Sequence, residues 1–173
     1  PVERFMQTYF RHATAVADIS SRFVAGLRPR SVWSRFIQYL LSHRSNEVFR
    51  VSGDEIDVTP RHRDRVCGSA ESLLNLYELA GLYSVRVAPE LAEHIRRTAP
   101  LLPRETSPEA ARLFLSILRA TGQVGRQLRS MYATGLLDAN LPEVTHARCL
   151  LQFNQYHAFT VDEHSFRAVE AAE

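Results

Sequence analysis

The apolar residues of this chain recur at the period of an α-helix along most of its 173 residues. Phe5, Tyr9, Val16 and Phe23, for example, fall on one face of a long amphipathic helix that Pro29 would stop. The expected helices cover residues 2–26, 32–41, 69–81, 89–98, 107–118, 124–134, 141–154 and 160–173. Such a pattern restricts the chain to a mainly α, multi-helix fold.

One stretch departs from the helical period. Short alternating runs flank the turn residues Ser52-Gly53-Asp54, with Val48 and Val51 before the turn and Ile56 and Val58 after it. Alternation on both sides of a glycine-containing turn is typical of a β-hairpin. We therefore expect one small hairpin near residues 47–59.

Two later helices have clear starting signals. Ser107 followed by Pro108 is an N-cap with proline in the first turn, and Leu113, Phe114 and Ile117 should form the buried face of that helix. The run from Thr160 to Glu163 matches a capping box, in which the Thr hydroxyl accepts from the Glu amide and the Glu side chain reaches back. This cap would place His164 on the first turn of the C-terminal helix.

Composition excludes several classes of function. The formal net charge is only +2 even though all 21 basic residues are arginine, so we expect no nucleic-acid partner. No apolar run reaches membrane-spanning length. Cys67 and Cys149 lie far apart without metal-binding spacing, as expected for free thiols of a cytoplasmic protein.

Four segments, taken together, resemble one known family. They are residues 1–13, residues 107–118, residues 131–137, and the C-terminal motif Tyr156-His157-x-x-Thr160-Val-Asp-Glu-His164 with its flanks. In this order they resemble the PII uridylyltransferase/uridylyl-removing enzymes, bifunctional bacterial regulators of nitrogen metabolism. The resemblance covers nearly the whole chain, with one departure at Asn154, where the family usually has Asp.

The resemblance implies a division of the chain. Residues 1–155 would be the central helical domain, and residues 156–173 would be the first turns of an incomplete HD hydrolase domain. His164 matches the first metal ligand of that domain, but no adjacent His-Asp pair follows it in this sequence. An upstream nucleotidyltransferase centre needs a Gly-Ser turn followed by an Asp-x-Asp pair. Here Glu55 and Asp57 precede Gly68-Ser69, so we expect structural roles for all four residues.

We therefore expect no catalytic and no cofactor-binding residue in the chain, and His164 as one ligand of an incomplete metal site. The parent enzyme implied by the resemblance would use UTP with Mg²⁺ or Mn²⁺, and its partners would be the PII signalling protein and the flanking catalytic domains. The chain begins without Met and its last helix lacks a stop signal, which suggests a fragment of a longer protein. Because both the Gly-Ser…Asp-x-Asp order and the His-Asp pair are absent from the sequence, we expect this fragment to be inactive alone. Two alternatives stay open: the related helical region of glutamine synthetase adenylyltransferase, and a stand-alone helical interaction domain.

Overall fold

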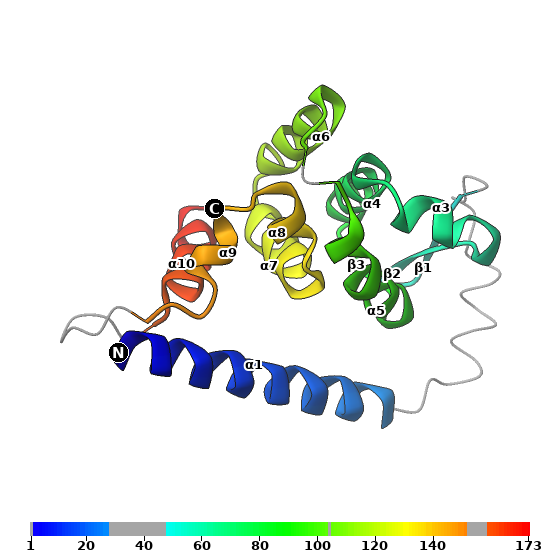
Figure 1. Ribbon diagram of the computed structural model, residues 1–173. Helices are drawn as coiled ribbons and strands as arrows, with labels where there is room; N and C mark the ends of the chain where they lie inside the picture. The colour runs from blue at the N-terminus through cyan, green and yellow to red at the C-terminus, as the bar shows by residue number, and fades with distance from the viewer. Residues whose placement is uncertain (1, 28–47, 104, 152–158) are drawn as a thin grey trace.

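The computed structural model describes residues 2–27, 48–103, 105–151 and 159–173, and it confirms a mainly α fold with a small sheet (Figure 1). The expected helix at residues 32–41 lies outside the described residues, as do Asn154 and His157. In chain order the elements are α1 (Val2–Leu27), β1 (Phe49–Ser52), β2 (Glu55–Val58), a 3-10 turn (Pro60–His62), α3 (Arg63–Cys67), α4 (Ala70–Leu82), β3 (Arg86–Val87), α5 (Pro89–Thr98), a second 3-10 turn (Ala99–Leu101), α6 (Pro108–Leu118), α7 (Val124–Thr134), α8 (Leu136–Asn140), α9 (Val144–Ala147) and α10 (Val161–Ala172).

The predicted hairpin is present. Strands β1 and β2 pair in antiparallel fashion, and Gly53 in the turn between them has a φ of 63°, which glycine adopts at little cost. A third strand, β3, pairs in parallel with β2, so that Ile56 lies opposite Val87. Sequence analysis missed β3 because two residues are too few to show an alternating pattern.

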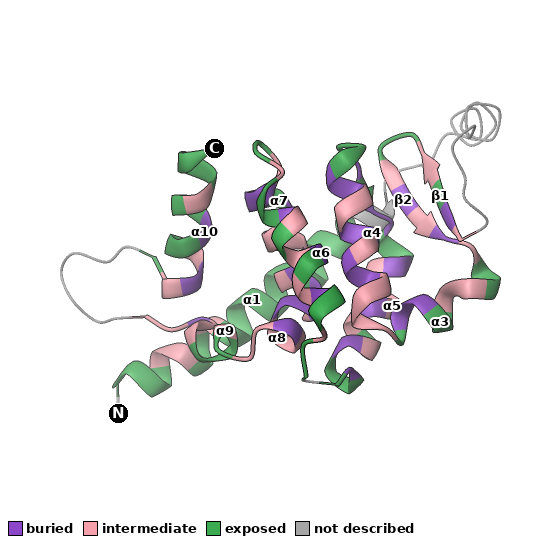
Figure 2. Ribbon diagram, turned by 90° about the horizontal axis from the view of Figure 1, so that it is seen from above, coloured by how far each residue is buried: buried purple, intermediate pink, exposed green. Residues whose placement is uncertain are grey.

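Helices α4 and α6 pack together at the centre of the core. Leu73, Leu76 and Tyr77 of α4 are completely buried, and the purple residues in Figure 2 mark this interior. On α6, Leu113 and Ile117 are buried as predicted, whereas Phe114 is only partly buried at the edge of the core. The face of α6 is therefore confirmed, but Phe114 is not among its fully buried members.

The chain between α7 and α10 differs from prediction. Helix α7 ends at Gly135 with a φ of 77°, as its sequence indicates. The helix expected at residues 141–154 is wrong in its described part, because within residues 141–151 only the single turn α9 forms. The backbone turns away at Arg148 and takes a φ of 55° at Cys149, a left-handed conformation that a helix does not allow.

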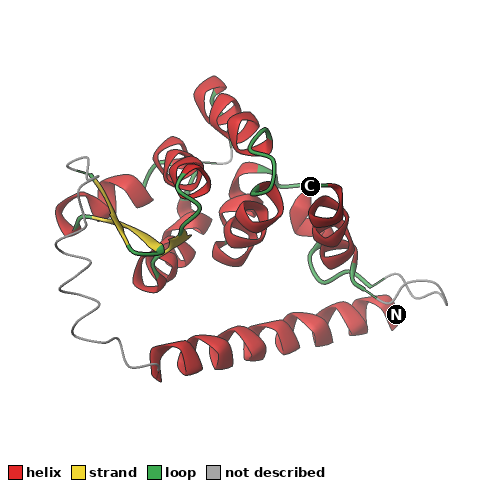
Figure 3. Cartoon of the chain, turned by 180° about the vertical axis from the view of Figure 1, so that it is seen from behind, coloured by secondary structure: helices red, strands yellow, loops and turns green. Residues whose placement is uncertain are grey.

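Helix α1 runs along one side of the other helices, as Figures 1 and 3 show from opposite directions. Among the described residues, its side chains contact other elements at three points: Gln7 donates to the Arg148 carbonyl, Thr14 lies 3.9 Å from the Cys149 sulfur, and Arg22 pairs with Glu93 at 2.5 Å. The large hydrophobic side chains exposed on α1 are Val2, Phe5, Tyr9, Val16, Ile19, Phe23 and Val24. Most of the apolar face of α1 is thus uncovered by the described residues.

Candidate functional site

His164 lies on the first turn of α10, as the sequence predicts, and it is exposed. The backbone places it there because Thr160, in an extended conformation, serves as the N-cap residue. The His164 amide then donates to the Thr160 carbonyl at 2.8 Å, which closes the first helical turn. The predicted start of α10 is therefore confirmed.

The prediction of reciprocal side-chain hydrogen bonds in the capping box is wrong. The Thr160 hydroxyl accepts no hydrogen bond from the helix amides. The Glu163 carboxylate does not reach back to Thr160 but binds two arginines, Arg129 of α7 and Arg167 one turn along α10, each at 2.7 Å. Both are charge-assisted contacts, which are stronger than a bond to a neutral amide. This competition explains why the sequence pattern forms its helix start without its reciprocal bonds.

Asp162 is the buried charged group of this region, with 8% of its surface exposed. One of its carboxylate oxygens accepts from the Cys149 amide at 2.9 Å and from the Tyr132 hydroxyl. Burial by itself would raise the pKa of Asp162, but the hydrogen bonds from Cys149, Thr160 and Tyr132 outweigh it and lower the pKa. Asp162 is therefore a carboxylate, and its donors hold it at a fixed position.

Arg148 and Cys149, which we call the junction, lie where several helices meet. The Arg148 guanidinium binds Asp138 of α8 (Nε to Oδ1, 3.1 Å), donates to the Tyr132 carbonyl of α7 at 2.8 Å and lies 3.6 Å from the centre of the Tyr132 ring. Cys149 bonds to Asp162 of α10. Because α1 also touches both junction residues, the junction connects α1, α7, α8 and α10.

The outer side of α10 is held to α7 by charge. Arg129 binds Glu163 and also Glu170, at 2.7 Å and 2.5 Å, and these bonds raise the pKa of the guanidinium. At the far end of the helix the Glu173 carboxylate accepts from the Val124 amide at 2.6 Å, at the N-terminus of α7. The position of His164 thus depends on the packing of α10 against α7.

The described residues do not assemble a metal site by themselves. Among them, no group of three His, Cys, Asp or Glu side chains is placed to hold a metal ion. Asp162, two residues before His164, is buried, and one of its carboxylate oxygens binds the Cys149 amide of the junction. His164 is one imidazole on a helix surface, and one imidazole does not make a tight site.

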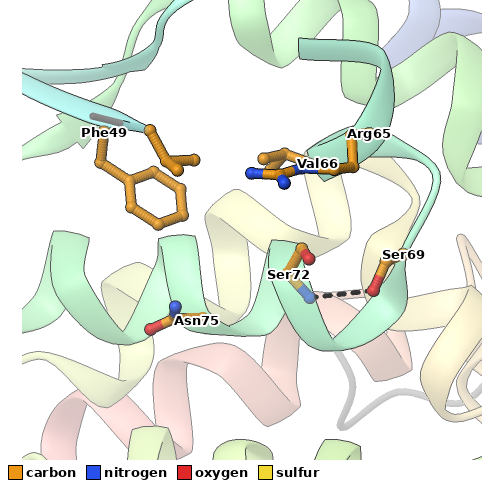
Figure 4. Close-up of a pocket in the computed structure, with 7 residues that line it drawn as sticks. Phe49, Arg65, Val66, Ser69, Ser72 and Asn75 are labelled. Carbon is orange, nitrogen blue, oxygen red and sulfur yellow. Dashed lines mark hydrogen bonds between the residues drawn. The ribbon is translucent and has the colours of Figure 1, made fainter. Parts of the chain in front are cut away.

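The residues compared above with a nucleotidyltransferase centre have structural roles. Ser69 caps α4 by accepting from the Ser72 amide at 3.2 Å (Figure 4). Asp57 pairs with Arg63 and Glu55 pairs with Arg86. These observations confirm the interpretation of a helix cap and a strand edge.

Ser69 also lines a pocket of about 430 Å³ between β1 and α4. Figure 4 shows its wall, where Phe49 and Arg65 approach the first turns of α4. The remaining lining residues are Val48, Val66, Ser72 and Asn75, so Arg65 is the single charged side chain of the lining. The pocket lies at the opposite end of the domain from α10 (Figure 1) and brings no carboxylate together with His164.

Sequence analysis located His164 but missed the groups that fix it. Tyr132, the junction and Asp162 are far apart in the chain and meet only through the fold. One sequence signal points to Asp162, its place two residues before His164 in the C-terminal motif. Nothing in the sequence around Cys149 indicates its left-handed backbone.

The fold and the candidate site define a helical module. The first turn of its last helix carries a buried aspartate and, two residues later, an exposed histidine. No family model matches the chain, and no solved structure matches it either. The chain is 28% identical to the bifunctional uridylyltransferase/uridylyl-removing enzyme of Ruegeria pomeroyi and 33% identical to that of Cereibacter sphaeroides, over 97% of its own length in both cases. The chain is therefore a relative of one segment of the bifunctional uridylyltransferase/uridylyl-removing enzymes, as the motif order indicates.

The chain spans about a fifth of the length of these curated relatives, 19% and 18% respectively. In the part of the chain that the structure describes, no helix is long and apolar enough to cross a membrane.

Proposed function

We propose that this chain is the helical module that links the nucleotidyltransferase domain to the HD hydrolase domain of a bifunctional uridylyltransferase/uridylyl-removing enzyme. The parent would be a cytoplasmic bacterial enzyme that transfers UMP from UTP to the PII signalling protein and removes it again. Similarity over 97% of the chain to about a fifth of two such enzymes supports this role. The same relatives favour it over the adenylyltransferase alternative.

The exposed apolar face of α1 is the structural observation that carries the proposal. Phe5 and Phe23 are each 69% exposed, and Tyr9 and Val16 lie on the same face between them. Soluble proteins rarely leave a continuous apolar surface uncovered unless another protein surface packs on it. In the parent, we propose that the domain preceding α1 covers this face.

In this proposal His164 belongs to the hydrolase half. Residues 156–173 would form the first turns of the HD domain, and His164 would contribute one ligand to a Mg²⁺ or Mn²⁺ site. The exposure of the side chain supports this role, because a ligand must be free to meet groups from another part of the protein. The other ligands would come from the part of the parent that follows α10.

Thiol labelling at α1 tests whether a larger enzyme covers this face. A Phe23→Cys variant should react rapidly with a maleimide in the chain alone, because this position is exposed and Cys67 and Cys149 are buried. In the full-length parent the same thiol should react at least about tenfold more slowly, since access limits the reaction. The labelled peptides are identified by mass spectrometry.

Asp18→Cys is the matched control, because Asp18 is an exposed residue on the polar side of the same helix. Its thiol should react at similar rates in the chain and in the parent. Equal labelling of Phe23→Cys in the two proteins would show that the apolar face stays open, and the linking role would then be wrong.

A further inference from the structure

The first turn of α10 is hydrogen-bonded in both directions to the junction and to Leu150, the residue that follows it. The Val161 amide donates to the Leu150 carbonyl at 2.8 Å, and the Cys149 amide donates to the Asp162 carboxylate at 2.9 Å. The Tyr132 hydroxyl of α7 donates to the same carboxylate oxygen. Burial and the bond to Asp162 both raise the pKa of Tyr132, so its hydroxyl keeps the proton that it donates.

The remaining contacts of α10 leave its position less well defined. Phe166 is buried and packs edge-on against the Tyr132 ring, with the ring centres 5.0 Å apart. Apolar packing is not directional, so it tolerates a rotation or a small shift of the helix. The ion pairs of Arg129 with Glu163 and Glu170 join side chains that are each about a third exposed or more, and water weakens such pairs.

The carboxylate of Asp162 therefore differs from the other contacts in being both buried and directional. The two donors to its Oδ2 atom come from different elements, the amide from the junction and the hydroxyl from α7. Two donors on one oxygen fix both the rotation of the first helical turn and its distance from α7. His164 follows two residues later on that turn, and its amide is already bonded to Thr160.

We propose that Asp162 is a positioning residue, whose buried carboxylate fixes the first turn of α10 on Tyr132 and the junction and thereby sets the place of His164. This proposal rests on the proposed function only in taking His164 to be a metal ligand. Asp162 touches no substrate and acts through the helix. One of the bonds to Asp162 comes from the amide of Cys149, a residue that is only 6% exposed.

The burial of Cys149 provides a test on the chain alone. Replacing Asp162 by Ala removes both bonds, so Cys149 should be alkylated faster, on the order of 10-fold to 100-fold. The exchange of the His164 amide with solvent, measured by NMR, should accelerate as well. Asp162→Asn, which keeps an acceptor oxygen in the same place, should restore most of the protection. Tyr132→Phe removes one donor and should give an intermediate rate.

Cys67 and Glu170→Gln are the internal controls. Cys67 is completely buried near the other end of the domain, so its alkylation should not change if the opening is local. Glu170→Gln breaks an exposed ion pair of α10 without touching the junction and should leave Cys149 protected.

Three results would overturn the proposal: unchanged rates at Cys149 and His164 in Asp162→Ala, an equal acceleration at Cys67 and Cys149, or an effect of Glu170→Gln as large as that of Asp162→Ala. An equal acceleration would mean that Asp162 supports the whole domain rather than the first turn of α10. Neither readout uses enzyme activity, so a failure of the proposed function is recognised separately.

Discussion

Glu71 connects the beginnings of two helices through its carboxylate. It accepts from the Ser107 hydroxyl at 2.6 Å and from the Ser69 hydroxyl at 2.9 Å. Each serine is at the same time the N-cap of its helix, Ser69 for α4 and Ser107 for α6. These bonds, led by the one from Ser107, lower the pKa of Glu71 below its ordinary value of 4.5.

This lowered pKa makes part of the stability depend on pH. The ionised form is favoured in the folded state, so its contribution is fully present above about pH 5 and is lost as the pH falls through the pKa of the folded protein. We expect the free energy of unfolding to fall less steeply toward acid in Glu71→Gln than in the unchanged chain. Urea titrations at a series of pH values measure this difference. Identical acid dependence in the two proteins would contradict the role of Glu71.

At this scale the sequence identifies residues whose roles are local. Ser69 and Ser107 are recognisable as caps because each bonds an amide three residues away. Asp162 and Cys149 are not recognisable, because their bond joins residues that lie 13 positions apart in the chain. The place of His164 along the helix is therefore predictable from the sequence, whereas the hydrogen bonds of Asp162 that hold this helical turn are not.

Helix α6 shows how well a periodic pattern predicts one element. Leu113 and Ile117 face the core with 4% and 2% of their surface exposed, while Leu115 on the same helix is 51% exposed. Phe114 packs against the core but stays partly open to solvent. The period gives the direction of the face, and the neighbouring helices decide how much of its edge they cover.

The loss of stability caused by alanine substitutions along α6 should follow the burial of the side chain that is replaced. Ile117→Ala should lower the free energy of unfolding by about 2–5 kcal/mol, because it leaves a cavity in the core. Phe114→Ala should cost less than Ile117→Ala, since part of the ring is already in water. Leu115→Ala is the matched control and should change stability by about 0.5 kcal/mol or less. Chemical denaturation measures all three, and a loss at Leu115 equal to that at Ile117 would contradict the orientation of α6.

The failed helix at residues 141–154 has a tertiary cause. Its apolar residues fit the helical period, yet the chain leaves the helix after Ala147. Arg148 is drawn to Asp138 and to the Tyr132 carbonyl, and the Cys149 amide is used by Asp162. A continued helix would lose these contacts, and tertiary contacts override weak local preference. Helices without such competition, such as α4 and α6, form where their sequences predict them.

At the scale of the whole molecule, the chain combines a packed core around α4 and α6 with a first helix whose apolar face the described residues leave largely uncovered. Its two end helices, α1 and α10, both contact the junction, α1 through Gln7 and Thr14 and α10 through Asp162. A module that links two catalytic domains needs a fixed relation between its two ends. The junction supplies contacts suited to this task, which agrees with the proposed linking role.

The most direct measurement is UMP addition and UMP removal by the full-length parent carrying His164→Ala. If His164 belongs to the hydrolase half, removal of UMP from uridylylated PII should fall to background while addition of UMP from UTP stays within about twofold of the unchanged enzyme. His146→Ala, at an exposed histidine of α9, is the control and should leave both activities intact. Normal UMP removal by the His164→Ala enzyme would contradict the account.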